Sequence, residues 1–181
     1  MRKIIYYVAS SVDGFIAGKN DDVSAYIYEG DAVEQYKEDL KSFKHVFMGR
    51  KTYEFGYQFG VKPGEPSPTY GHMTQYILSN NLELDNLHQQ VKIIPLNAML
   101  IKDLKANVDS DIYLCGGGQL AGWMIENALL DELKIKLNPV LIGDGTKLFE
   151  GIKKPYKLEL LEHKEYENNM MVLHYIIKYS E

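Results

Sequence analysis

Cysteine is almost missing from this chain, and so are long apolar runs. The only cysteine among the 181 residues is Cys115, which excludes a disulfide within the chain. A reducing compartment is therefore the expected environment, and we predict a cytoplasmic protein. No apolar stretch reaches the roughly 20 residues that a membrane-spanning helix requires, so we expect no membrane partner. The basic residues before the apolar run 4–8 superficially resemble a signal peptide, but Asp13 and Gly14 interrupt that run too early.

An excess of positive charge is missing too. Lysine and arginine together number 20 against 25 acidic residues, which gives a formal net charge of −5. Nucleic acids attract basic surfaces, so we predict no nucleic-acid partner. A composition of 45% hydrophobic and 25% charged residues is typical of one globular domain, which we place at residues 1–181.

The usual signatures of metal centres and of serine hydrolases are also missing. The five histidines form no i, i+4 pair and no H-E-x-x-H motif, and no C-x-x-C motif accompanies Cys115. We therefore predict no metal site. Ser10 and Ser11 lack the G-x-S-x-G turn of a nucleophilic serine. Cys115 ends an apolar run, where a small packed side chain is a commoner role than a nucleophile.

Two glycine-containing turns carry the functional hypothesis. In segment 47–54 an apolar run breaks at Gly49 and continues with basic and hydroxyl residues, and in segment 112–120 an apolar run breaks at three glycines. Such strand-to-helix turns bind phosphate because glycine lets the backbone approach closely and a helix N-terminus attracts anions. Neither segment matches G-x-G-x-x-G or G-x-x-x-x-G-K-[ST], and a basic residue after a strand is more often solvated surface.

Apolar periodicity predicts a mixed, mostly parallel α/β sheet that ends in an antiparallel hairpin. Asp31 is expected to cap the first helix, with Glu34 three positions on, and Asn168-Asn169 to form the hairpin turn. Residues 13–29 are expected to be loop, and the proline-rich stretch 60–72 a flap beside the site or a subunit contact. We expect strands at about 3–9, 45–48, 74–79, 91–94, 111–115, 131–138, 156–165 and 170–179, and helices at about 31–44, 50–55, 98–106 and 117–128.

Several segments together resemble the dihydrofolate reductase-like family. Residues 9–17, 48–54, 77–80 and 115–118 have the order and spacing found in these proteins. The stretch Pro139 to Gly145, followed by Leu148-Phe149, is more similar to the reductase domain of the bifunctional riboflavin-biosynthesis enzyme and to free-standing bacterial proteins grouped with it. The resemblance implies a dihydrofolate reductase-like three-layer α/β fold.

The resemblance also implies NADPH as the cofactor and a set of residues that hold it. The basic turn, at residues 49–52, would cradle the phosphates. The second glycine turn, at residues 116–118, would offer bare backbone with a cis Gly116–Gly117 bond. Main-chain groups near the first strand would meet the nicotinamide. A homodimer is a possible assembly. The implied cofactor-binding residues are Ala9, Ile16, Gly49, Arg50, Lys51, Thr52, Ser79, Asn80, Gly116, Gly117, Gly118 and Gln119.

Two acids are the candidate catalytic residues, Asp13 after the first strand and Glu34 in the first predicted helix. We expect both to border the pocket of a small heterocyclic substrate, although Asp13 beside Gly14 is as often a turn stabiliser. The implied activity is that of a 5-amino-6-(5-phosphoribosylamino)uracil reductase. The alternatives are a dihydrofolate or other pterin reductase and a non-catalytic nucleotide-binding protein. The chain carries no H-x-E and P-C-x-x-C deaminase signature.

Overall fold

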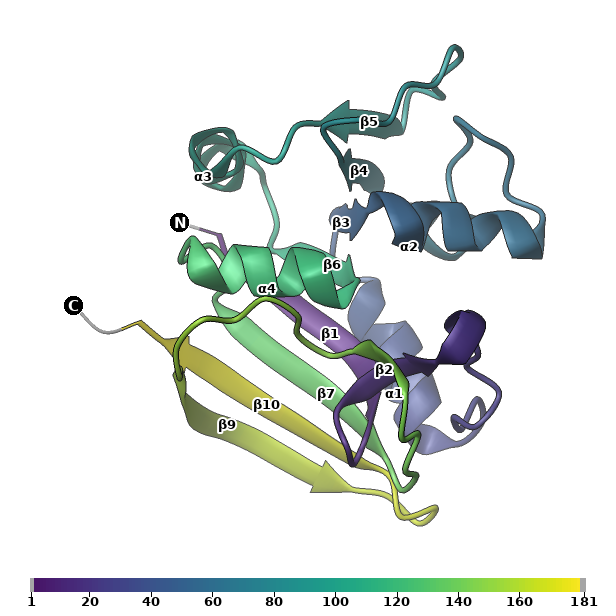
Figure 1. Ribbon diagram of the computed structural model, residues 1–181, viewed down its shortest axis with the longest axis vertical. Helices are drawn as coiled ribbons and strands as arrows, with labels where there is room; N and C mark the ends of the chain where they lie inside the picture. Colours follow the sequence, from purple (N-terminus) through teal and green to yellow (C-terminus); the bar gives the residue numbers. More distant parts are fainter. Residues whose placement is uncertain (1, 180–181) are drawn as a thin grey trace.

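The computed structural model describes residues 2–179. They form three layers, with an eight-stranded sheet between helices on its two faces (Figure 1). The strand order is β5-β4-β3-β6-β1-β7-β10-β9. The parallel strands are β1 (Ile4–Ser11), β3 (His45–Gly49), β4 (Thr74–Leu78), β5 (Val91–Ile94), β6 (Ile112–Gly116) and β7 (Glu132–Asn138). Strand β10 (Met171–Lys178) runs antiparallel to β7 and to the edge strand β9 (Lys157–Glu165). The predicted mixed sheet with a C-terminal hairpin is confirmed.

Helices cover both faces of the sheet because the central strands are apolar on both sides. Helices α3 (Ala98–Asn107) and α4 (Gly118–Glu126) pack with Tyr6 of β1 in one core. Helices α1 (Asp31–Leu40) and α2 (Arg50–Phe55) pack with the next residue, Tyr7, in the other. Successive side chains of a strand point to opposite faces, so adjacent tyrosines belong to separate cores. Figure 1 shows α4 in front of the sheet and α1 behind it.

A second, two-stranded sheet was not predicted. Strand β2 (Phe15–Gly18) pairs antiparallel with β8 (Gly145–Lys147). The expectation of continuous loop over residues 13–29 was therefore wrong at β2, and a short 3-10 turn (Lys19–Asp21) follows it. Both strands are too short to show a period of their own, and their partners lie far apart in the sequence. Local patterns do not record such pairing.

The start of α1 also differs from the prediction. Gly30, not Asp31, occupies the position before the helix, with φ at 99°, and no side chain caps the first turn. This φ lies in the region that glycine adopts without steric cost. Asp31 and Glu34 instead lie in the first turn, where the helix dipole favours acidic side chains. At the other end of the chain, Asn169 adopts φ of 61° in the β9–β10 turn, as its residue type predicted.

The proline-rich stretch 60–72 is fixed against the α2 side of the sheet. The Tyr53 hydroxyl of α2 accepts a hydrogen bond from the Gly64 amide at 2.8 Å and donates one to the Glu65 carbonyl at 2.9 Å. The buried Gln75 side chain of β4 bonds both backbone groups of Ser67. Short 3-10 turns form at Gly56–Phe59 and Pro68–Tyr70. The stretch is thus an ordered covering of this face.

Candidate functional site: the glycine turns at the carboxyl edge of the sheet

The two glycine turns lie side by side in space. Strands β3 and β6 are neighbours, and Met48 of β3 is the pairing partner of Gly116 of β6. Strand β3 ends at Gly49, and α2 begins at the next residue, while α4 begins two residues after β6 ends. Parallel strands share one carboxyl edge, which is where ligands bind in open α/β sheets. The structure therefore brings both predicted turns to one edge.

Gly117 lies at this edge, and because it has no side chain its backbone is bare. A Cβ atom built on Gly117 would lie 3.4 Å from Thr52 Oγ1 and 4.0 Å from Ile16 Cδ1. Three residues from the implied cofactor set, Ile16, Thr52 and Gly117, thus meet although they come from three separate segments. Gly116 has φ of 133°, which only glycine adopts readily, and the Gly116–Gly117 peptide bond is cis, as the resemblance implied. Bare backbone between a hydroxyl and an aliphatic side chain suits a flat cofactor lying against it.

The basic turn and the β4 terminus lie next to each other. Gly49 pairs with Leu78, the last residue of β4, so Arg50 and Ser79 each follow a paired strand end. Arg50 and Lys51 are both exposed, and Arg50 Nε donates to Glu54 Oε1 at 2.7 Å one helical turn on.

The residues after β4 are tied by local hydrogen bonds. Ser79 Oγ accepts from the Asn81 amide, and Asn80 Oδ1 accepts from the Leu96 amide at 2.9 Å. Asn80 thereby holds the segment between β5 and α3 beside the end of β4. The Ser79 hydroxyl keeps its own hydrogen to donate to a ligand.

Gly118 has a packing role at the start of α4. A Cβ on Gly118 would fall 2.1 Å from the Lys147 carbonyl oxygen, and the Glu150 amide donates to the Gly118 carbonyl at 3.0 Å. A Cβ atom on Gly122, one turn later, would clash in the same way with the Glu150 carbonyl oxygen, at 1.8 Å. Residues 147–150 therefore cross α4 in direct backbone contact, and Gln119 is exposed beside them. Gly122 was not singled out from the sequence, where its i, i+4 spacing from Gly118 is the available signal.

Asp13 stabilises the turn after β1. Ser11 Oγ donates to Asp13 Oδ1 at 2.6 Å, and the amides of Ile142 and Gly143 donate to the carboxylate at 3.0 and 2.7 Å. The Ser11 hydroxyl and then these two amides lower the pKa of Asp13 to about 2. The carboxylate is therefore ionised at neutral pH and joins the β1–β2 turn to residues 142–143. A role toward substrate stays a prediction.

Glu34 lies on the exposed side of α1. Its carboxylate pairs with Lys37 Nζ at 2.7 Å, and its side chain is 67% exposed. Within residues 2–179 no hydrogen bond or ion pair joins Glu34 to Asp13 or to the glycine turns. The structure does not bring the two candidate acids together by any contact, and a catalytic role for Glu34 stays a prediction.

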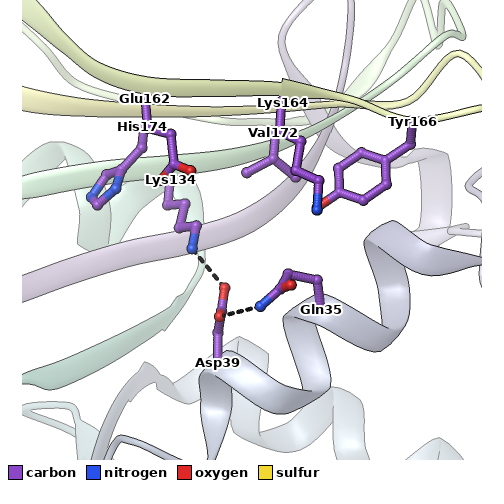
Figure 2. Close-up of a pocket in the computed structure, with 8 residues that line it drawn as sticks. All are labelled: Gln35, Asp39, Lys134, Glu162, Lys164, Tyr166, Val172 and His174. Atoms are coloured by element: carbon purple, nitrogen blue, oxygen red, sulfur yellow. Dashed lines mark hydrogen bonds and ion pairs between the residues drawn. The ribbon is translucent and has the colours of Figure 1, made fainter.

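A small groove between α1 and the C-terminal hairpin is a separate feature. Figure 2 shows Lys134 of β7 pointing to Asp39 of α1, with Nζ and Oδ2 2.6 Å apart, and Gln35 reaching the same carboxylate. The groove has a volume of about 180 Å³. Its lining comes from α1, β7, β9, β10 and Tyr166, and includes none of the glycine-turn residues. Because Lys134 and Asp39 already neutralise each other, we assign the groove no ligand.

Sequence reasoning missed a buried lysine on the α1 side of the sheet. Lys136 of β7 is 9% exposed, and its Nζ lies 3.9 Å from the centre of the Tyr36 ring. Burial, with a smaller contribution from Lys37, lowers the pKa of Lys136 to about 8. The sequence did contain a signal for this buried lysine. Side chains alternate along Glu132–Asn138, which puts Lys134 and Lys136 on one face of an apolar interior strand.

Tyrosine hydroxyls and one thiol lie on the same face as Lys136. Tyr36 Oη lies 2.7 Å from Tyr113 Oη, and Tyr70 Oη lies 3.1 Å from Cys115 Sγ. Burial raises the pKa of the Cys115 thiol, so it is a poor nucleophile, as its sequence context indicated. Tyr70 comes from the proline-rich stretch, which thus covers the end of β6.

Two further observations bear on ligands and membranes. Among the described residues, no group of three or more histidine, cysteine, aspartate or glutamate side chains is placed to hold a metal ion. No helix in the same part of the chain is both long enough and apolar enough to cross a membrane.

These features define a dihydrofolate reductase-like α/β protein, and comparison with known proteins gives its family. The RibD C-terminal domain model matches residues 2–172, and the chain belongs to this family. The uncharacterized protein YyaP of Bacillus subtilis (strain 168) is 27% identical over an alignment 184 positions long, which covers 96% of this chain and 94% of YyaP.

Solved structures share the fold at lower identity. A protein of Shewanella sp. PV-4 whose name links it to riboflavin biosynthesis has a TM-score of 0.79 at 21% identity, with 99% of this chain and 100% of that chain covered. The diaminohydroxyphosphoribosylaminopyrimidine deaminase/5-amino-6-(5-phosphoribosylamino)uracil reductase of Thermotoga maritima has a TM-score of 0.71 at 14% identity, with 98% and 57% covered. Dihydrofolate reductase of Enterococcus faecalis, in complex with NADP(H), has a TM-score of 0.65 at 14% identity, with 97% and 96% covered.

Proposed function

We propose that this protein is an NADPH-dependent reductase that transfers a hydride to a small heterocyclic substrate of the 5-amino-6-(5-phosphoribosylamino)uracil type. The observation that carries the proposal is the convergence of Ile16, Thr52 and Gly117 at the carboxyl edge of β3 and β6. Membership of a reductase family supports an oxidoreductase, and the NADP(H) complex of the Enterococcus enzyme supports the choice of cofactor.

The chain's own residues would bind and orient the cofactor. Thr52 and the backbone at Gly49 would contact the phosphates, while the bare Gly116–Gly117 surface would lie under the cofactor. Ala9 and Ile16 would meet the carboxamide of the nicotinamide through main-chain groups. The bound nicotinamide supplies the hydride, so the protein contributes mainly positioning and exclusion of water.

Discrimination of NADPH from NADH would fall to the basic turn after β3 and to the β4 terminus. Arg50 and Lys51 are exposed cations, and the Ser79 hydroxyl follows the neighbouring strand. Arg50 would exchange its surface partner Glu54 for the extra phosphate, and an exposed pair of this kind is weak. Two charge-assisted contacts would favour NADPH by about 2 to 4 kcal/mol.

The test is a direct assay of binding and turnover. Purified protein is titrated with NADPH, and NADPH oxidation at 340 nm is then followed with 5-amino-6-(5-phosphoribosylamino)uracil and, separately, with dihydrofolate. The proposal expects oxidation with the aminouracil. Oxidation with dihydrofolate alone would favour the pterin reductase, and stoichiometric binding without turnover on either acceptor would favour a non-catalytic nucleotide-binding protein.

A further inference from the structure

Arg50 of the basic turn is held by an acid of its own helix. Arg50 Nε donates to Glu54 Oε1 at 2.7 Å, and the two side chains are 49% and 31% exposed. Among the residues that the structure describes, this is the only ion pair of Arg50, and the neighbouring Lys51 takes part in none. Of the two cations assigned to the cofactor's phosphates, one is therefore paired and the other is free.

The pair does not serve the helix on which it lies. Arg50 is the first of the six residues of α2, and Glu54 is the fifth. The helix dipole disfavours a cation in the first turn and an anion in the last. Pairs of this i, i+4 spacing are also more favourable when the acid comes first in the sequence. The stability of α2 therefore gives no reason for this arrangement of charges.

The pair draws the guanidinium of Arg50 away from the strand ends. Gly49 pairs with Leu78, so Arg50 and Ser79 start from the same edge of the sheet. Glu54 lies about 6 Å further along the axis of α2, and Figure 1 shows this helix leading away from the end of β3. A phosphate that binds between Arg50 and Ser79 has to draw the guanidinium back from Glu54.

We propose that Glu54 is a positioning residue that competes with the extra phosphate of NADPH for Arg50 and thereby sets how strongly NADPH is preferred over NADH. A carboxylate and a phosphate are both anions that a guanidinium binds through the same N–H groups. The free energy of the Arg50–Glu54 pair is therefore subtracted from the binding of NADPH.

NADH is not subject to this competition because it lacks the extra phosphate. Glu54 should thus act on the ratio of the two affinities and not on the affinity for the shared part of the cofactor. The inference rests on the proposed function, since only bound NADPH brings that phosphate to Arg50.

The experiment measures this ratio in a variant that keeps the shape of the acid and removes its charge. The parent and Glu54→Gln are titrated with NADPH and with NADH by calorimetry at low ionic strength. The ratio of the dissociation constants, NADH over NADPH, should rise about two- to fivefold in Glu54→Gln, as the strength of a half-exposed ion pair predicts. A purely structural role for Glu54 would move both affinities together.

Two further variants separate this effect from a general loss of negative charge. Glu38→Gln is the matched control, because Glu38 is an exposed acid paired with Lys41 at the end of α1. It should leave the ratio at the parental value. In a background of Arg50→Met, Glu54→Gln should also leave the ratio unchanged, because the arginine for which the two anions compete is gone.

Three results would overturn the inference. They are a parental ratio in Glu54→Gln, an equal rise in Glu38→Gln, and a rise that persists in the Arg50→Met background. Equal affinities of the parent for NADPH and NADH, or binding of neither, would instead refute the proposed function.

Discussion

A Cβ atom built on Gly117 would lie 3.4 Å from the hydroxyl oxygen of Thr52, so the start of α4 and the first turn of α2 border the same stretch of bare backbone. The two residues follow β6 and β3, which pair directly in the sheet. A cofactor lying on that surface would contact both turns at once. The account of this protein as a reductase depends on that arrangement.

Gly117→Ala tests the surface without a large cost to folding. Gly117 has φ of −95°, which alanine tolerates, and its new methyl group would meet its neighbours at ordinary contact distances. We expect NADPH affinity to fall by at least about tenfold, because the methyl group would occupy the cofactor's surface, with a loss of unfolding free energy below about 1 kcal/mol. Calorimetric titration and urea unfolding measure the two quantities. Gly71→Ala, at a glycine with φ of −60° in the proline-rich stretch, is the control and should leave NADPH affinity unchanged.

Gly122→Ala separates packing from cofactor binding. The new Cβ would lie 1.8 Å from the Glu150 carbonyl oxygen, so the backbone of residues 147–150 has to move away from α4. We expect a loss of about 2 kcal/mol or more in the free energy of unfolding. Gln119→Ala, an exposed position in the same helix, should change it by less than about 0.5 kcal/mol. Equal stability of the two variants in urea would contradict the close contact.

Asp13→Ala should loosen the segment that its carboxylate holds. The amides of Ile142 and Gly143 lose their acceptor, so their hydrogen exchange should become faster by about tenfold or more, while that of the β7 amides stays the same. Glu34→Gln, which removes an exposed ion pair on α1, should leave this hydrogen exchange unchanged. Turnover of Glu34→Gln tests the predicted catalytic role of that acid, which expects slower turnover with intact NADPH binding, whereas turnover at the parental rate would contradict it.

Lys136 gives the stability of the protein a specific pH dependence. Its pKa is about 8 in the folded protein and near its usual 10.5 in the unfolded chain. Between these values the unfolded chain binds more protons, so the free energy of unfolding should rise with pH from about 8 towards 9.5, by about 1 to 2 kcal/mol. Lys136→Met should lack this rise. Urea unfolding of both proteins at pH 7.0 and 9.5 measures it, and parallel pH profiles would contradict the lowered pKa.

The sequence predicted the main sheet and its edge but not the small contacts that complete the site. Apolar runs predicted the eight strands of the main sheet, and glycines marked the two turns, because these features act within a few residues. The β2–β8 pair escaped prediction, since each strand is short and its partner is remote. Nothing in the sequence around Asp13 indicated that the amides of Ile142 and Gly143 would donate hydrogen bonds to its carboxylate. Lys136 was overlooked because a lysine in an alternating strand is usually solvated.

NADPH binding at the glycine turns is the central claim, and one calorimetric comparison tests it most directly. The parent protein is titrated with NADPH and with NADH under the same conditions, at low ionic strength. The account predicts a single NADPH site per chain, with NADH weaker by at least about 30-fold because the extra phosphate meets Arg50, Lys51 and Ser79. Equal affinities for the two cofactors, or no binding of either, would contradict it.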